Sequence, residues 1–79
     1  MKKLQKNNSR SKKPITPKQR MTLNFILKFR KRKQYMPSLE EISRHFRIAI
    51  VSSWERLDKL RRAGYIRKKK NQKRWIEIL

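Results

Sequence analysis

The sequence has no cysteine, one glycine, one histidine and only 5 acidic residues among its 79 positions. Without cysteine, the chain can form neither the disulfides of small secreted scaffolds nor a thiolate metal site. No apolar run approaches the roughly 20 residues of a membrane span, and no apolar block follows the N-terminal lysines as in a signal peptide. These absences predict a cytosolic protein that has no membrane partner.

The residue types that carry catalysis are equally scarce. His45 is the single histidine, and the adjacent carboxylates Glu40 and Glu41 are typical of the acidic first turn of a helix. No glycine-rich loop could hold a phosphate, and no His, Cys or Asp cluster has metal-ligand spacing. We therefore predict that the protein is not an enzyme and has no catalytic residues, no cofactor and no metal.

Positive charge is what the sequence has in abundance. Its 25 Lys and Arg residues against 5 Asp and Glu give a formal net charge of +20. Hydrophobic residues make up 35% of the chain, which is enough for the core of one small domain. A small, strongly basic chain is typical of polyanion binders, so nucleic acid is the predicted partner. We expect the protein in the cytoplasm, associated with the nucleoid.

The first 14 residues differ in composition from the rest of the chain. Residues 1–14 contain six basic side chains, no acidic one and a single large apolar residue besides the initial methionine. Such a segment cannot bury enough apolar surface to offset its ordering entropy, so we predict a disordered basic arm. Two roles stay open for it, a solvated tail without function and a tethered set of cations that adds phosphate contacts.

Two helix starts carry capping signals. Thr16 and Pro17 suit the N-cap and the first helical position, because the proline lacks an N–H that the helix would leave unbonded. Ser38, followed three residues later by Glu41, is a capping box in which each side chain can bind the other residue's N–H. These signals predict one helix from Pro17 to about residue 33 and a second over about residues 39–46.

A third helix and a hairpin complete the pattern. A break at residues 47–49 precedes the third helix, which ends at Gly64 as its left-handed C-terminal residue. A short and a longer helix joined by a tight turn are the helix-turn-helix pattern. Alternating apolar residues over 65–68 and 74–79 predict two strands joined by a basic loop, which form a wing. The predicted fold is mostly α with a small β-hairpin, a three-helix winged helix-turn-helix over residues 15–79.

Apolar residues at helical spacing predict which helix faces form the core. In the first helix they are Leu23, Ile26 and Leu27, with Met21, Phe25 and Phe29 widening the stripe. In the second they are Leu39, Ile42 and Phe46. In the third, one face carries Ile50, Ser53, Leu57 and Leu60.

Four blocks of sequence stand in a recognisable order. They are ITPKQR at residues 15–20, YMPSLEEI at 35–42, LDKLRRAGYI at 57–66 and RWIEIL at 74–79. In their order and spacing these blocks resemble the DNA-binding domain of LexA-type repressors, over the whole of residues 15–79. The sequence departs from the family in the turn after the second helix, which is one residue shorter and has Arg47 where the family usually has glycine.

The resemblance implies a sequence-specific double-stranded DNA-binding transcriptional regulator, a LexA-like repressor that acts by occupying its operator. The sequence has no counterpart of the family's self-cleaving C-terminal domain, so we expect neither self-cleavage nor the dimer contacts of that domain. Two copies would then pair weakly on palindromic DNA or through a partner protein. Two alternatives stay open: a non-specific architectural or RNA-binding protein, and an interaction module of a larger assembly.

In a helix-turn-helix, the N-terminal half of the second helix reads base edges, and neighbouring groups hold the DNA backbone. The predicted base-reading residues are Ala49, Val51, Ser52, Trp54 and Glu55. The predicted backbone contacts are Lys18, Arg20, Ser38, His45, Arg56, Lys69, Lys70, Lys73 and Arg74.

For several of these residues an ordinary structural role is an open alternative. Ser52 could serve as an N-cap or first-turn hydroxyl, and Glu55 could pair with the lysine four residues further on. Trp54 could fold onto the edge of the core, and His45 could be a plain surface residue. Trp75 is predicted to cover the outer face of the hairpin, on the strand face opposite its apolar neighbours.

Overall fold

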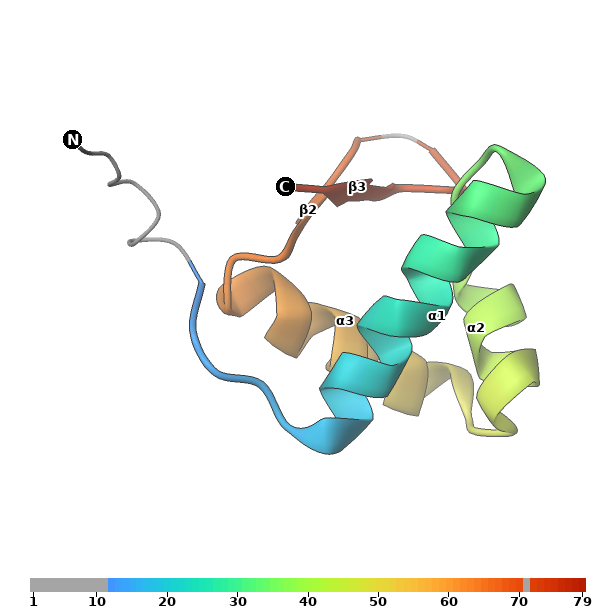
Figure 1. The fold of residues 1–79 in the computed structure, drawn as a ribbon. Coiled ribbons are helices and arrows are strands. Elements are labelled where there is room, and N and C mark those ends of the chain that lie inside the picture. The colour runs from blue at the N-terminus through green and yellow to red at the C-terminus, as the bar shows by residue number, and fades with distance from the viewer. Residues whose placement is uncertain (1–11, 71) are drawn as a thin grey trace, which may run out of the picture.

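A computed structural model describes residues 12–70 and 72–79 of the chain. Its elements are α1 (Pro17–Lys33), α2 (Leu39–Phe46), α3 (Ile50–Arg62), β2 (Ile66–Lys68) and β3 (Ile76–Ile78). In Figure 1, α1 crosses in front of α3, α2 lies beside α1, and the hairpin of β2 and β3 lies above them. Three helices followed by a two-stranded antiparallel hairpin confirm the predicted fold class.

The core lies where the three helices meet the hairpin. Its fully buried apolar side chains come from every element: Ile26, Ile42, Leu57, Leu60, Ile66 and Ile76. Three residues of the predicted apolar stripes are instead largely exposed, Met21 at 56%, Leu27 at 40% and Ile50 at 45%. Met21 and Leu27 lie outside the buried face of α1, and Ile50 is the first residue of α3, so three-dimensional packing and not helical spacing alone decides their exposure.

The N-termini of α1 and α2 have the same reciprocal hydrogen bonds. At α2, the Ser38 hydroxyl accepts from the Glu41 N–H at 3.2 Å, and the Glu41 carboxylate accepts from the Ser38 N–H at 2.8 Å. This confirms the predicted capping box. At α1, Thr16 and Gln19 form a second box with distances of 3.3 and 3.0 Å. Both helices therefore begin at the predicted residues, with their first N–H groups bonded.

The C-terminus of α3 ends in a Schellman motif at the single glycine. Gly64 has φ 90, its N–H donates to the Arg61 carbonyl at 3.1 Å, and the Tyr65 N–H donates to the Leu60 carbonyl at 3.0 Å. This confirms the predicted left-handed glycine after the helix. The helices α1 and α2 also end in a left-handed residue, but there it is Gln34 and Arg47, with φ 68 and 57.

Arg47 occupies a backbone position that favours glycine. A side chain in the left-handed region costs about 1 to 2 kcal/mol, and glycine avoids that cost although it loses more chain entropy on folding. We expect Arg47→Gly to raise the free energy of unfolding by about 0.5 to 1 kcal/mol, measured by urea denaturation. The matched control is Arg44→Gly, which makes the same change inside α2 and should lower stability by about 1 kcal/mol. A loss of stability in Arg47→Gly would contradict the prediction.

The hairpin is shorter than predicted but its pairing extends beyond the strands. The register places Ile66 opposite Ile78, Arg67 opposite Glu77 and Lys68 opposite Ile76. Further backbone hydrogen bonds join the Leu79 N–H to the Tyr65 carbonyl and the Lys69 N–H to the Trp75 carbonyl. The predicted boundaries therefore differ by one or two residues, because the outer residues pair without full strand geometry.

Residues 12–14 lie against the end of α3. The Lys13 N–H donates to the Ala63 carbonyl at 2.9 Å, and the Tyr65 hydroxyl donates to the Lys13 carbonyl at 3.0 Å. The last part of the predicted arm is thus bonded to the domain. The rest of that arm, residues 1–11, lies outside the described residues. Within the described residues, no helix is long and apolar enough to cross a membrane.

Candidate nucleic-acid interface

A buried pair of hydroxyls joins the two helices of the helix-turn-helix. The side-chain oxygens of Ser43 in α2 and Ser53 in α3 lie 2.7 Å apart, and the two residues are 6% and 0% exposed. The turn between them is closed by the Ile48 N–H, which donates to the Ser43 carbonyl at 3.0 Å. A buried hydroxyl without a partner would be costly, so this pair fixes the start of α3 against α2.

Four of the five predicted base-reading residues lie in the first half of α3, and the fifth, Ala49, directly precedes it. Val51 is 64% exposed, and the exposed Glu55 follows it one turn later on the same side. Ala49 is the N-cap residue and has no side-chain cap. Ser52 is half-buried and does not cap the helix, so the N-cap part of its open alternative is wrong, but the residue does lie in the first turn of α3.

Ser52 and Glu55 face a surface hollow between α3 and the start of α1. The same hollow is lined by the predicted backbone residues Lys18 and Arg56, and the remaining lining residues are Thr16, Gln19, Ile48 and Lys59. No ion pair within 4 Å joins Glu55 to a cation among the described residues. The structure therefore brings two predicted base readers and two predicted backbone cations to one side of α3.

Trp54 lies on the other side of α3, against the hairpin. Its ring centroid is 5.4 Å from that of Trp75, with the two rings at 76°. Trp54 is 40% exposed and contacts Trp75 of the wing, which itself packs against the core. The predicted position of Trp75 on the outer face of the hairpin is wrong. Trp75 precedes β3, so the alternation of a strand does not apply to it, and its side chain contacts α3.

Arg56 is held between α1 and α2. Its guanidinium donates to the Thr22 hydroxyl of α1 at 3.3 Å and lies over the Phe46 ring of α2, 5.1 Å from the centroid. Thr22 is fully buried and in turn donates to the Lys18 carbonyl at 2.9 Å. Sequence reasoning did not identify Thr22, and its only signal is a polar residue at a core position of the α1 stripe.

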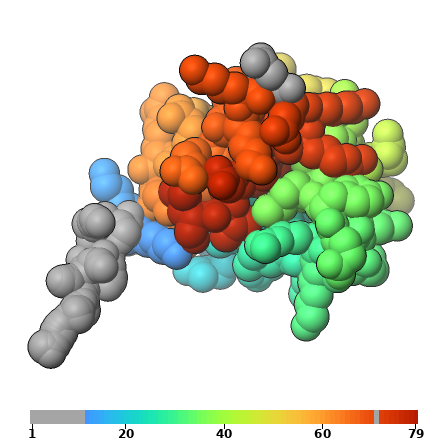
Figure 2. Space-filling view, turned by 90° about the horizontal axis from the view of Figure 1, so that it is seen from above, coloured from blue at the N-terminus to red at the C-terminus, as the bar shows by residue number. Residues whose placement is uncertain are grey.

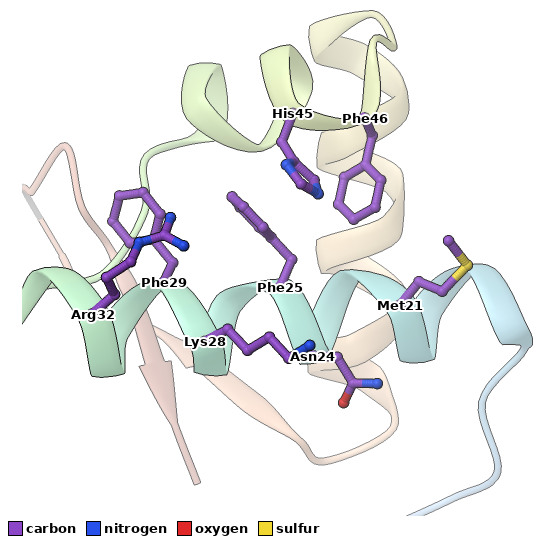
Figure 3. Close-up of a pocket in the computed structure, with 8 residues that line it drawn as sticks. All are labelled: Met21, Asn24, Phe25, Lys28, Phe29, Arg32, His45 and Phe46. Atoms are coloured by element: carbon purple, nitrogen blue, oxygen red, sulfur yellow. The ribbon is translucent and has the colours of Figure 1, made fainter.

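His45 packs on the aromatic side chains between α1 and α2. Its ring is stacked on Phe25 with centroids 4.1 Å apart and meets Phe46 edge-on at 4.6 Å. Figure 3 shows these three side chains at a pocket between the two helices, with Lys28 and Arg32 reaching from α1. This pocket shares no lining residue with the hollow beside α3. The structure thus places His45 apart from the group around Ser52.

Arg74 ties the wing to the start of α2. Its guanidinium donates to both oxygens of Glu41, at 2.5 and 3.2 Å, and to the Met36 carbonyl at 2.8 Å. It also lies over the Tyr35 ring, 4.3 Å from the centroid. In Figure 2, seen from above, the hairpin in orange and red reaches from the end of α3 to the green connection between α1 and α2.

The hydrogen bond from Arg74 is the main reason that the pKa of Glu41 is lowered to about 2, and the capping bond from the Ser38 N–H lowers it further. Ser38 is 3% exposed, and its hydroxyl is engaged with the Glu41 N–H. Ser38 and Arg74, both predicted backbone contacts, therefore bind protein groups here and hold the wing in place.

The remaining predicted cations are exposed and unpaired among the described residues. Lys69, Lys70 and Lys73 lie at the tip of the hairpin, while Lys18 and Arg20 lie in the first turn of α1. The ion pairs of the described residues use other cations, at Asp58 with Arg61 and Arg62, and at Glu77 with Arg67. Three of the five carboxylates are thus neutralised locally, and the surface left for a partner is strongly positive.

Among the described residues, no group of three or more His, Asp or Glu side chains could hold a metal ion. What the arrangement offers is a rigidly held helix with an exposed polar and apolar face, with cations on both sides of it. Such a surface is suited to a duplex whose base edges meet the helix and whose phosphates meet the cations.

Comparison with known proteins agrees with this geometry. The sequence model of the LexA DNA binding domain matches residues 12–75. The chain is 36% identical over 67 residues to a LexA repressor of Leptospira biflexa, and 38% identical over 66 residues to one of Thermotoga neapolitana. These alignments cover 85% and 84% of this chain but 33% and 34% of the relatives, so the chain spans about a third of their length. The resemblance found in the sequence is confirmed, and the chain belongs to the LexA DNA-binding domain family.

Proposed function

We propose that the chain is a sequence-specific, double-stranded DNA-binding transcriptional repressor that acts by occupying its operator. The observation that carries this proposal is the exposed first half of α3, held against α2 by the buried bond between Ser43 and Ser53. Binding without sequence preference would need only the positive charge, whereas reading bases requires a helix held at a fixed angle. The relatives described above are themselves named LexA repressors.

The side chains of α3 supply the chemistry of base reading. The Ser52 hydroxyl can donate to or accept from either strand, and the Glu55 carboxylate can accept from a cytosine amino group. The exposed Val51 can contact a thymine methyl group, with Ala49 leaving room at the helix entry. Trp54 would contact the duplex beside these base-reading residues, where α3 lies against the wing.

The cations around α3 supply the grip on the DNA backbone. Lys18 and Arg56 line the hollow between α1 and the recognition helix, where they would meet one phosphate strand, and the exposed Arg20 of the first turn of α1 would add to this set. The wing carries a second set, Lys69, Lys70 and Lys73, and a wing along the minor groove meets an enhanced negative potential there. His45 would contact a phosphate only if the DNA backbone extends as far as the C-terminal end of α2.

Pairing of two copies depends on the DNA in this proposal. A chain with a formal charge of +20 repels a second copy in free solution, and neutralising phosphates remove that repulsion. We therefore expect weak pairing on palindromic half-sites, or pairing through a partner protein, rather than a stable free dimer.

Selection of bound duplexes from a random pool, at about 0.15 M salt, tests the proposed function. We expect the wild-type chain to enrich a narrow motif, and the double variant Ser52→Ala/Glu55→Ala to lose it. Each lost base contact is worth about 1 to 3 kcal/mol, so discrimination between motif and scrambled duplex should fall at least about tenfold.

The matched control for this selection is Glu40→Ala. It removes an exposed carboxylate from the first turn of α2 and changes the net charge by the same amount as Glu55→Ala. The control should keep the motif. Enrichment of duplexes without any motif by the wild-type chain would contradict the proposal and indicate an architectural protein that binds only the backbone.

A further inference from the structure

Lys68 and two tryptophans form a cluster between the recognition helix and the wing. The Lys68 ammonium lies 5.6 Å from the ring centroid of Trp54 and 5.8 Å from that of Trp75. The two rings contact each other at 5.4 Å. These are the only two tryptophans of the chain, and Lys68 was not among the residues that the sequence pointed to. We refer to Trp54, Lys68 and Trp75 as the helix–wing cluster.

The strand register explains why Lys68 faces the two tryptophans of this cluster. Lys68 is opposite Ile76, which is 2% exposed, so both side chains leave the hairpin on its core-facing side. The neighbouring Arg67 leaves on the other side and pairs with Glu77 at 3.0 Å. Lys68 is the last residue of β2, and its side chain contacts Trp54 of α3 and not the buried core. The lysine therefore remains exposed to solvent.

The geometry of a duplex decides which part of the DNA would meet this cluster. If α3 lies in the major groove and the wing lies over the adjacent minor groove, one phosphate strand separates the two grooves. That strand has to pass between the helix and the wing. The side chains exposed at their junction therefore face sugars and phosphates and not base edges.

We propose that the helix–wing cluster is a binding site for this DNA phosphate strand, with the Lys68 ammonium on a phosphate and the two indoles against the adjoining sugars. The site deepens the DNA-binding function proposed above and rests on it. Its ligand class is a phosphodiester backbone, so its contribution is independent of base sequence.

The two indole rings prepare Lys68 for this contact. A free lysine loses considerable rotamer entropy when it binds a phosphate, but cation–π contacts with two rings already restrict this one. An indole also carries an N–H that can donate to a phosphate oxygen and an apolar ring suited to a deoxyribose. The cluster thus couples the wing to α3, so that both would meet the duplex as one unit.

Duplex binding by the full chain, measured by fluorescence anisotropy over a range of salt concentrations, tests the proposed phosphate site at the helix–wing cluster. The probes are a duplex with the selected motif and a scrambled duplex of the same length. We expect Lys68→Gln to weaken binding to both probes by a similar factor, about threefold to tenfold. The slope of log affinity against log salt should become shallower by about 1, because one fewer phosphate is neutralised.

Lys31→Gln is the matched control, because Lys31 is an exposed cation of the last turn of α1 and its replacement changes the net charge by the same amount. Trp75→Phe keeps an aromatic ring beside Lys68, whereas Trp75→Leu does not, so only the leucine variant should reproduce the shallower slope.

Intrinsic tryptophan emission of the wild-type chain should change on saturation with duplex, since both indoles become covered.

The outcomes separate this site from the proposed function. A wild-type chain that does not discriminate between the two probes overturns the proposed function, whatever Lys68 contributes. If the wild-type chain discriminates but Lys68→Gln has the same salt slope as Lys31→Gln, only the proposed phosphate site at the helix–wing cluster is overturned. A purely structural role for Lys68 would lower the melting temperature and leave the salt slope unchanged, which also counts against the site.

Discussion

DNA affinity of the wild-type chain should fall about a thousandfold when the salt concentration rises from about 0.05 to 0.2 M. Six of the predicted backbone cations have no carboxylate partner among the described residues: Lys18, Arg20, Arg56, Lys69, Lys70 and Lys73. Each phosphate that a protein cation neutralises contributes about −0.9 to the slope of log affinity against log salt, so six contacts give a slope of about −5. Anisotropy titrations with one duplex at four or five salt concentrations measure it.

The cations that the fold already uses provide the comparison. Arg61 and Arg62 pair with Asp58, at 2.7 and 3.0 Å, and lie in the last turn of α3, away from its first half. Replacing both by glutamine should change the slope less than replacing Lys69 and Lys70 by glutamine, although the charge change is equal. A slope shallower than about −2 for the wild-type chain would mean that few of the six cations reach phosphates.

The second large effect concerns the contact between Glu41 and Arg74. Glu41→Gln keeps a side chain that can cap α2 but removes the charge that binds Arg74. At pH 6 we expect the variant to lose about 1 to 2 kcal/mol of unfolding free energy. This is less than the pKa shift alone would give, since the pair is partly exposed to solvent and so is screened.

This loss should depend on pH in a defined direction. Arg74 and the capping bonds lower the pKa of Glu41 from 4.5 to about 2, so the folded state holds the ionised form more tightly than the unfolded state does. The stabilisation is fully present above about pH 4.5 and is lost as the pH falls through about 2. Wild type and Glu41→Gln should therefore converge in acid, because a protonated Glu41 resembles glutamine.

Urea denaturation of both proteins between pH 6 and 2 measures this convergence. Glu40→Gln serves as the control, because Glu40 is an exposed neighbour with no ion pair among the described residues, and its difference from wild type should be small at every pH. A constant difference between wild type and Glu41→Gln down to pH 2 would show that the contact is not electrostatic.

Local signals predicted the elements of this fold well because their causes are local. The N-caps at Thr16 and Ser38, the breaks between helices and the glycine after α3 depend on a few neighbouring residues. The burial of Ile26, Ile42, Leu57 and Leu60 follows from helical spacing. The sequence also identified the first half of the third helix as the candidate surface, because a helix-turn-helix always presents that part.

The candidate site was predicted less completely, since its side chains are placed by contacts between distant segments. Arg74 meets Glu41 across 33 positions and Arg56 meets Thr22 across 34, and no local pattern indicates either pair. Nothing in the sequence distinguishes Ser43 and Ser53 from other serines, because their hydroxyls meet only when the two helices pack together. Among the predicted backbone residues, Ser38 and Arg74 proved to bind protein groups.

By itself, the sequence determined the three helices and the hairpin, their order, the family and the excess of positive charge. These features are encoded in residue types and short spacings, which remain the same whatever the packing. Only the tertiary structure decided that Trp75 turns to Trp54, that Lys68 lies beside both rings, and that Arg74 is engaged with α2. Such contacts depend on how the wing docks on the helices, and docking is determined by the sum of many weak interactions along the whole chain.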